Sequence, residues 1–188
     1  MHPFAMKPLT RRALARSATT LLAAVALAPA QAFFFRTPQW PEIKQSIHEG
    51  HPGMPQTTTA QLRLWLADAS RAPPLLLDSR APAEYEVSHL QGARLAPSLS
   101  AALRVLEGRA KDAPVVVYCS VGVRSAALVQ QLMREGWLNV SNLDGSIFEW
   151  ANQGYPVFRG DAPAILVHPY SKSWGTLLNR RYWAESAL

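Results

Sequence analysis

The sequence predicts an α/β fold in which a central parallel sheet is covered by helices on both faces. Two short apolar runs, Leu75–Leu77 and Val115–Val117, have the length and composition of strands that are buried on both sides. Each run is followed by a loop and then by a segment with helical periodicity, and alternating strands and helices favour parallel pairing. Ligands usually bind at the carboxyl ends of such strands. We therefore look for a site where these two runs end.

Residues 1–32 predict an export signal. Basic residues come first, the apolar run Leu21–Leu27 follows, and Ala30–Ala32 offers a small-x-small cleavage site. The pair Arg11–Arg12 resembles a twin-arginine signal, and an uncleaved membrane anchor is the alternative. We expect cleavage after Ala32 and a mature protein in the periplasm or otherwise outside the cytoplasm.

The formal net charge of +6 is largely a property of this leader. The leader holds four basic residues and no acidic one, whereas the rest of the chain carries 15 basic and 13 acidic residues. No basic stripe with interleaved aromatic residues occurs in that remainder. We therefore expect no binding to nucleic acid.

Residues 33–56 contain several prolines and few periodic apolar residues, so we expect an extended lead-in. His48 and His51 stand three residues apart, whereas the histidines of a zinc-protease helix are four apart. Gly50 and Pro52 also disfavour a helix there. We expect no metal site.

The expected domain begins at Thr57. Thr57–Thr59 offers an N-cap for a short helix that contains Leu62–Leu66, and Pro73 and Pro74 end that helix before the first buried run. Pro82 is well placed at the start of a helix over 82–87. The further elements expected are a strand over 93–95, a helix over 100–106, the strand ending at Tyr118, a helix from Ser125 that Gly136 ends, a strand over 139–143 and a helix over 147–152.

The strand that ends at Tyr118 leads into Cys119, the only cysteine, and into a loop that closes on Arg124. The N–H groups of the loop and the positive end of the next helix would surround the thiol. Gly122 lets the backbone approach a ligand closely, and Arg124 adds a fixed charge with planar donors. We expect a reactive thiolate with a depressed pKa, with the N–H groups as the main cause and Arg124 as the second. The alternative is a small buried hydrophobe.

Residues Tyr118–Ser125 resemble the active-site loop of single-domain rhodaneses, the sulfurtransferases that carry sulfur as a cysteine persulfide. Other landmarks of that family occur in the same order, namely Asp78–Arg80, His89–Ala93 and Leu143–Trp150. Ser146 replaces the second glycine of the last motif, a change that serine tolerates as a good helix N-cap. The resemblance covers 57–158.

The resemblance implies a rhodanese-like fold and a catalytic role for Cys119. It implies that Asp78 and Arg80 tie loops together near the site and that His89 fixes a turn. No cofactor is implied beyond the persulfide on Cys119. The implied partners are a small sulfur donor, such as thiosulfate or a low-molecular-weight persulfide, and a thiol or other thiophilic acceptor. The anion-binding loop would comprise Ser120, Val121, Gly122, Val123, Arg124 and Ser125, and its apolar rim leaves the donor open.

Two other functions are compatible with parts of this pattern. A cysteine phosphatase also combines a cysteine, an anion-binding loop and an arginine, but usually with five residues between the two side chains. Four residues separate Cys119 from Arg124, which predicts a loop too tight for phosphate. The second alternative is a non-enzymatic binding or sulfur-relay module, and such modules often lack the cysteine.

Residues 159–188 lie beyond the resemblance. Trp174, Leu178 and Trp183 alternate with basic residues, a pattern typical of an amphipathic helix docked on the domain. The alternative is a surface for a protein partner or a membrane.

Overall fold

The computed structural model describes residues 37–187, which belong to one compact unit. The expected export signal lies outside the described residues. Among residues 37–187, no helix has both the length and the apolar character that a membrane crossing requires.

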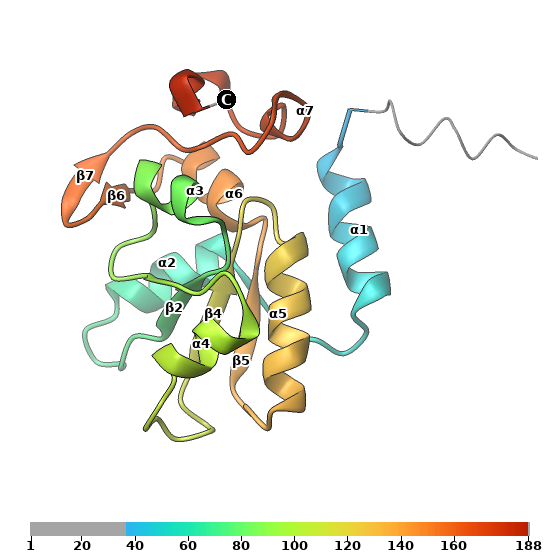
Figure 1. Cartoon of the computed structure of the whole chain (residues 1–188), viewed down its shortest axis with the longest axis vertical. Helices are drawn as coiled ribbons and strands as arrows, with labels where there is room; N and C mark the ends of the chain where they lie inside the picture. Colours follow the sequence, from blue (N-terminus) through green and yellow to red (C-terminus); the bar gives the residue numbers. More distant parts are fainter. Residues whose placement is uncertain (1–36, 188) are drawn as a thin grey trace, which may run out of the picture. The chain divides into compact units, whose positions relative to one another are not determined.

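A five-stranded parallel sheet forms the centre of the molecule (Figure 1). Its strands follow the order β1-β5-β4-β2-β3, so that β4 is the middle strand. This confirms the α/β fold with a central parallel sheet. The strands are β1 (Gln56–Thr58), β2 (Leu75–Asp78), β3 (Arg94–Leu95), β4 (Val115–Tyr118) and β5 (Val140–Asp144).

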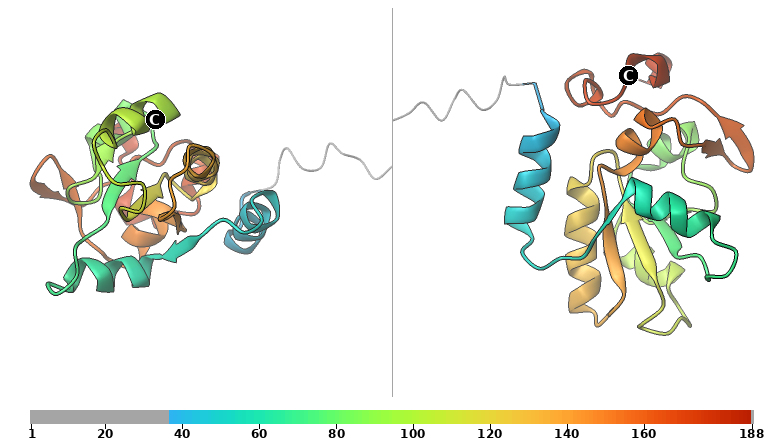
Figure 2. Two further views of the ribbon diagram at one scale, coloured as in Figure 1. Left: turned by 90° about the horizontal axis from the view of Figure 1, so that it is seen from below. Right: turned by 180° about the vertical axis from the view of Figure 1, so that it is seen from behind.

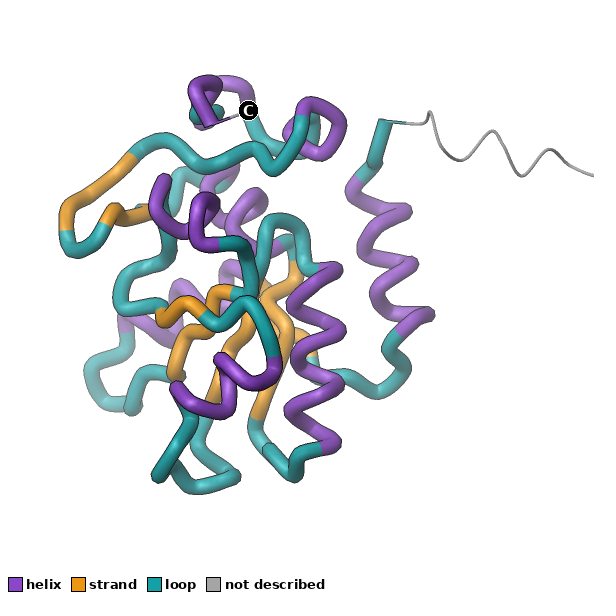
Figure 3. Tube along the Cα trace, in the orientation of Figure 1, coloured by secondary structure: helices purple, strands orange, loops and turns teal. Residues whose placement is uncertain are grey.

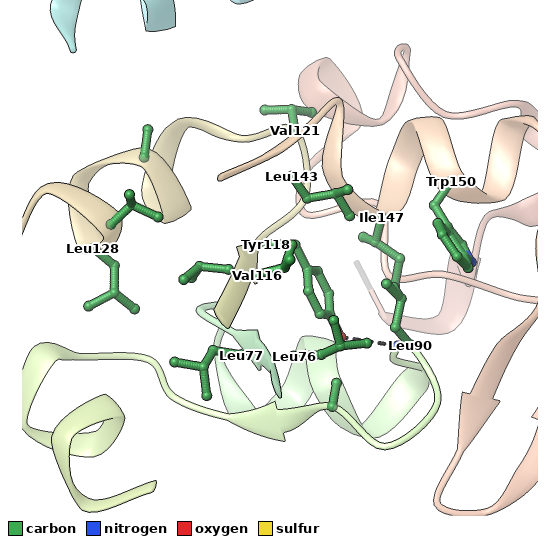
Figure 4. Packing of buried hydrophobic residues seen from close by; sticks show 14 of the residues in the cluster. Leu76, Leu77, Leu90, Val116, Tyr118, Val121, Leu128, Leu143, Ile147 and Trp150 are labelled. Carbon is green, nitrogen blue, oxygen red and sulfur yellow. Dashed lines mark hydrogen bonds between the residues drawn. The ribbon is translucent and has the colours of Figure 1, made fainter. Parts of the chain in front are cut away.

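Strand β4 is buried along its whole length, as its run of β-branched residues predicts. Val117 lies opposite Leu77 of β2 and Asn142 of β5. The side chain of Tyr118 reaches into the core, where its hydroxyl oxygen accepts a hydrogen bond from the N–H of Leu90 at 3.0 Å (Figure 4). Strand β4 therefore has a neighbouring strand on each edge and buried side chains on both faces. These contacts fix the position of its carboxyl end, where Cys119 follows.

Helices cover the sheet on opposite faces, with α5 on one and α2 on the other (Figures 1 and 2). Thr58 caps α2 in a reciprocal capping box with Gln61, and Pro82 occupies the first turn of α3, as the sequence predicts. After α5, Gly136 takes a left-handed φ of 83° and ends the helix, which confirms its expected role. The helices of this domain are α2 (Thr59–Ala67), α3 (Pro82–Val87), α4 (Leu99–Val105), α5 (Val123–Arg134) and α6 (Ser146–Asn152).

The expectation of an extended lead-in over 33–56 is wrong, because α1 (Trp40–Gly50) is a helix that lies beside α5 (Figure 3). Pro41 stands in the first turn, where the missing N–H costs no intrahelical bond. Ile43 and Ile47 are one helical turn apart and are both buried. Two apolar residues on one face thus outweigh a composition that favours loops.

Lys44 links α1 to the carboxyl end of β5 and to α6 through two ion pairs. Its ammonium group lies 3.0 Å from the carboxylate of Asp144 and 2.7 Å from that of Glu149. Asp144 is the last residue of β5 and Glu149 lies on α6. Helix α1 is therefore part of the folded domain.

The C-terminal segment is not the single amphipathic helix that its spacing predicts. It contains a hairpin of β6 (Val157–Arg159) and β7 (Ala162–Ala164), the short helix α7 (Lys172–Gly175) and two 3₁₀ turns. Helix α7 ends at Gly175, and glycine disfavours the continuation of a helix, so Trp174, Leu178 and Trp183 do not share one helix. The segment nonetheless packs on the domain, with Trp174 half-buried against the core and with buried side chains that include Val167, Leu177, Leu178 and Trp183.

Candidate active site

Cys119 follows the last residue of β4, and 1% of its surface is exposed. The backbone N–H of Gly122 points at the thiol and lies 3.2 Å from Sγ. This contact places an N–H donor of the loop on the sulfur. The thiol thus occupies the floor of the loop between β4 and α5.

Gly122 is required by the shape of this loop. Its φ of 110° is a conformation that residues with a side chain rarely adopt. A Cβ atom at this position would lie 3.2 Å from the side chain of Ile47 and 3.4 Å from that of Asn142. Helix α1, through Ile47, therefore packs directly against the cysteine loop.

The first turn of α6 is hydrogen-bonded to the backbone of the cysteine loop. The N–H groups of Ile147 and Phe148 donate to the carbonyl oxygens of Cys119 and Ser120, at 3.2 and 3.0 Å. The hydroxyl oxygen of Ser146 accepts a hydrogen bond from the N–H of Cys119 at 3.2 Å. Ser146 is not the helix N-cap that the sequence analysis expects, because Gly145 takes that position. The hydroxyl of Ser146 instead bonds to the backbone N–H of Cys119.

Arg124 is held by Glu84, a residue on α3 that lies 40 positions earlier in the chain. The two terminal guanidinium nitrogens donate to the two carboxylate oxygens at 2.7 and 2.8 Å. The hydroxyl of Ser120 donates to the same carboxylate at 3.0 Å, and Arg124 also contacts that hydroxyl oxygen at 2.9 Å. A bidentate pair of this kind fixes the plane of the guanidinium group.

The pair between Glu84 and Arg124 stays ionised across the physiological range. Burial alone would raise the pKa of Glu84, but the hydrogen bonds from Arg124 and from the N–H of Ala81, with the charge of Arg124, lower this pKa to about 2. Burial likewise opposes the charge of Arg124, but its bonds to Glu84 and the nearby Cys119 raise the pKa of the guanidinium group. A fixed positive charge is therefore present beside the thiol.

The pKa of Cys119 is lowered in the folded protein. Burial acts in the opposite direction and is the largest single effect, since it disfavours the thiolate. The charge of Arg124 is next, followed by hydrogen bonds from Ser125 and from the N–H of Gly122, and together they outweigh burial. Arg124 is the largest single cause of the lowered pKa, and several hydrogen bonds to the sulfur add to it.

A cavity of about 130 Å³ opens above Cys119. Tyr170 and Trp174, both from the C-terminal segment, form part of its wall. The ring of Tyr170 lies 4.8 Å from the guanidinium carbon of Arg124. The remaining lining residues are Ser120, Val121, Val123 and Arg124.

Ser125 does not line this cavity. Its buried hydroxyl donates a 2.6 Å hydrogen bond to the side-chain oxygen of Asn142 on β5. This bond anchors the first turn of α5 to the sheet. Of the six loop residues that the sequence singled out, Ser120, Val121, Val123 and Arg124 face the cavity, whereas Gly122 and Ser125 shape the loop.

Asp78 and Arg80 lie near the site without lining the cavity above Cys119. Both side chains are fully buried and form a 2.6 Å ion pair. Arg80 also donates to the carbonyl oxygen of Ser88 at 2.6 Å. These contacts join the loop after β2 to the segment after α3.

His89 also lies outside the cavity above Cys119. Its ring stacks on that of Tyr85 at 3.9 Å, and its backbone exchanges two 2.8 Å hydrogen bonds with Phe158. The imidazole borders a separate open cavity of about 490 Å³ together with Arg94 and Arg159. Its contacts are those of a residue that fixes a turn.

The sequence analysis places neither Glu84, Tyr170 nor Trp174 at the site, and it expects Trp174 only to dock the C-terminal segment. Glu84 stands at the third position of α3, where a glutamate typically caps the helix. Its carboxylate indeed accepts a hydrogen bond from the N–H of Ala81 at 3.0 Å. That signal does not reveal its second partner, Arg124. The two aromatic residues show only an apolar pattern in the sequence. Among residues 37–187, no three His, Cys, Asp or Glu side chains gather in a way that could hold a metal ion.

Residues 58–153 match the family described as the Rhodanese-like domain. A protein of Mycobacterium tuberculosis named probable adenylyltransferase/sulfurtransferase MoeZ is 35% identical over 102 residues, which are 53% of this chain and 25% of that protein. A sulfurtransferase of Allochromatium vinosum is 39% identical over 83 residues, which are 44% of this chain and 77% of that protein. The chain therefore spans a quarter of the first relative and most of the second.

The fold is similar to that in the crystal structure of a thiosulfate sulfurtransferase from Pseudomonas aeruginosa. The TM-score is 0.55 at 21% identity, and the similarity covers 74% of this chain and 26% of that one. At this identity the likeness shows the fold alone.

Proposed function

The chain belongs to the rhodanese-like domain family, a family of sulfurtransferases, and on that premise we propose that it moves sulfane sulfur to a thiophilic acceptor through a persulfide on Cys119. The observation that carries this proposal is the setting of the thiol. The sulfur lies at the end of a rigid strand, 3.2 Å from a backbone N–H and near the fixed charge of Arg124, and its pKa is lowered.

In the first half-reaction, the Cys119 thiolate attacks the sulfane sulfur of the donor. A new S–S bond forms to Cys119, the donor's own bond to that sulfur breaks, and the bonding pair leaves with the rest of the donor. The persulfide that results is an anion at the same place as the thiolate, so the N–H of Gly122 and the charge of Arg124 stabilise it in the same way.

In the second half-reaction, the acceptor attacks the outer sulfur of the persulfide. The S–S bond breaks and its electron pair returns to Cys119, which regenerates the thiolate. No metal or redox cofactor takes part in either step, because the sulfur moves as a neutral atom between nucleophiles. A loop held by α6 and by the bond between Ser125 and Asn142 keeps the sulfur in place through both steps.

The proposal is tested by steady-state transfer from thiosulfate or an alkanethiosulfonate to cyanide, with thiocyanate as the measured product. We expect turnover by the wild type and background rates for Cys119→Ser, since a serine oxygen cannot form the persulfide. Leu138→Ala changes a side chain that is 77% exposed and serves as the control with wild-type rates. Turnover that survives in Cys119→Ser would overturn the proposal.

A further inference from the structure

The cavity above Cys119 is closed by residues from outside the region that matches the family. Tyr170 and Trp174 line it together with Val121 and Val123 of the cysteine loop, whereas the family match ends at residue 153. We refer to Tyr170 and Trp174 as the aromatic wall. The wall adds apolar surface directly above the nucleophile.

Within the wall, Trp174 is held in place by the fold. The N–H of Trp174 donates to the hydroxyl oxygen of Ser171, which caps α7. Gly175 packs so tightly against the ring of Trp183 that a Cβ atom there would lie 2.5 Å from it. Trp183 is itself buried, and its indole N–H donates to the carbonyl oxygen of Leu178 at 3.0 Å. The position of Trp174 is thus set by buried packing rather than by a free chain end.

The cavity offers little free positive charge. Arg124 is the only charged residue that lines it, and both terminal nitrogens of its guanidinium group are bonded to the carboxylate of Glu84. The ring of Tyr170 lies 4.8 Å from the same guanidinium group. The charge of Arg124 already balances the carboxylate of Glu84 and stabilises the Cys119 thiolate, so a dianion that enters this cavity loses its hydration and finds no further cation among the lining residues, which is unfavourable.

The volume sets a further limit. A cavity of about 130 Å³ holds roughly four water molecules at about 30 Å³ each, which corresponds to a short aliphatic group beside the reacting sulfur. We propose that Tyr170 and Trp174 select the sulfur donor, favouring a small donor with an apolar organic group and at most one negative charge over the dianion thiosulfate. This inference rests on the proposed function, since it concerns the donor of the same site.

Organic persulfides and alkanethiosulfonates belong to the favoured class. With ethanethiosulfonate, the Cys119 thiolate bonds to the terminal sulfur, the bond between that sulfur and the sulfonyl sulfur breaks, and the electron pair leaves with ethanesulfinate. With thiosulfate the same bonds form and break and the leaving group is sulfite. The two donors thus differ at one position, where an ethyl group replaces a charged oxygen, and they form a matched pair.

The test measures kcat/KM for both donors with cyanide as the acceptor. Each kcat/KM is divided by the rate constant for the reaction of the same donor with a small free thiol. This division corrects for the different intrinsic reactivities that the two leaving groups give the donors. We expect the wild type to prefer ethanethiosulfonate at least tenfold. We expect Tyr170→Ala and Trp174→Ala to lower this preference about tenfold, the effect of a lost apolar contact in a specificity pocket. The change should come from slower reaction with ethanethiosulfonate and an unchanged or faster reaction with thiosulfate.

Two further variants separate donor selection from damage to the fold. Tyr170→Phe keeps the ring and should keep the preference. Leu166→Ala alters a side chain of the same segment that is 45% exposed and does not line the cavity, so it should behave as the wild type. A structural defect would slow the reaction with both donors equally, whereas loss of the aromatic wall should slow the reaction with ethanethiosulfonate and not that with thiosulfate.

The outcomes distinguish this inference from the proposed function. If the wild type takes sulfur from neither donor, the proposed function fails. If the wild type takes sulfur from both and prefers thiosulfate, or if the alanine variants keep the wild-type ratio, the aromatic wall does not select the donor. The wild-type comparison decides the matter even where an alanine variant fails to fold.

Discussion

Arg124 affects Cys119 through its charge, and this effect predicts how the thiol titrates. In the wild type, iodoacetamide alkylation followed against pH should show a midpoint below the ~8.5 of a free cysteine. Arg124→Ala removes the largest of the effects that lower the pKa of Cys119 while the raising effect of burial stays, so the midpoint should rise. Arg134→Ala, on the exposed side of the same helix, is the matched control and should leave the midpoint unchanged. An unchanged midpoint in Arg124→Ala would contradict the electrostatic account.

Glu84 links the stability of the domain to acid pH. Its pKa in the folded protein is about 2, below the ~4.3 of an ordinary glutamate, so its contribution is complete above about 4.3 and is lost as the pH falls through about 2. Glu84→Gln should lower the free energy of unfolding at neutral pH by about 1.5–3 kcal/mol, the range for hydrogen bonds to charged groups. It should also flatten the loss of stability between about pH 4.3 and 2.

Urea unfolding at a series of pH values measures both effects. Glu107→Gln, an exposed glutamate in a loop, is the control and should follow the wild-type curve. A Glu84→Gln protein with the wild-type pH dependence would show that the pair with Arg124 does not depress the pKa of this carboxylate.

At the residue scale, the sequence identifies the groups that are close in the chain. Cys119, Gly122 and Arg124 fall in one loop between a strand and a helix, so their proximity follows from the local pattern. Glu84 and Tyr170 reach the same place only through tertiary packing, 40 positions before Arg124 and 46 after it. No local pattern in a single sequence connects positions that far apart.

At the scale of elements, the cysteine loop depends on the helix α1 that packs against it. Gly122→Ala would place a methyl group 3.2 Å from the side chain of Ile47 in a backbone conformation that disfavours any side chain. We expect a loss of stability of more than about 1–2 kcal/mol, the cost of the conformation alone, and a higher alkylation midpoint for Cys119.

The matched control for this variant is Gly108→Ala. Gly108 also has a positive φ, of 74°, but a Cβ atom there would have no neighbour within 4 Å. Thermal unfolding should therefore show a smaller loss for Gly108→Ala, and its Cys119 midpoint should not move. Equal losses in the two variants would show that contact with α1 does not matter to the loop.

Elements with a strong apolar pattern are the ones that the sequence predicts well. The two apolar runs form β2 and β4 as expected, because short runs of β-branched and aliphatic residues are typical of strands that are buried on both faces. Helix α1 is not predicted because the prolines and glycines of residues 33–56 suggest a loop, although Pro41 is harmless in a first turn. In the C-terminal segment the aromatic spacing predicts one helix, but Gly175 lies within that spacing and the helix ends there.

At the scale of the whole molecule, the alternation of strands and helices was enough to predict the fold class. The position of Tyr170 and Trp174 in the cavity wall is not predictable from the sequence, since the segment after residue 158 has no pattern beyond apolar spacing. The domain places Cys119 at the carboxyl end of the sheet, and the chain then returns over that end with α7. The C-terminal segment thereby forms part of the cavity wall through Tyr170 and Trp174.

Export is a proposal about the whole chain that rests on the order of residues 1–32. In a Gram-negative host, we expect N-terminal sequencing of the protein to begin at Phe33 and the protein to be found in the periplasm. Replacing Arg11 and Arg12 by lysine should block export if the twin-arginine route is used, and should have no effect on the general secretory route. An intact Met1 on protein in the cytoplasm would contradict the proposal.

The central claim is that Cys119 carries the transferred sulfur, and intact-protein mass spectrometry tests it most directly. The wild type, treated with ethanethiosulfonate or thiosulfate and freed of excess donor, should gain the mass of one sulfur atom. Dithiothreitol or cyanide should remove that mass, and Cys119→Ser treated in the same way should gain nothing. A wild type that gains no sulfur from either donor, or a Cys119→Ser protein that gains as much as the wild type, would contradict the claim.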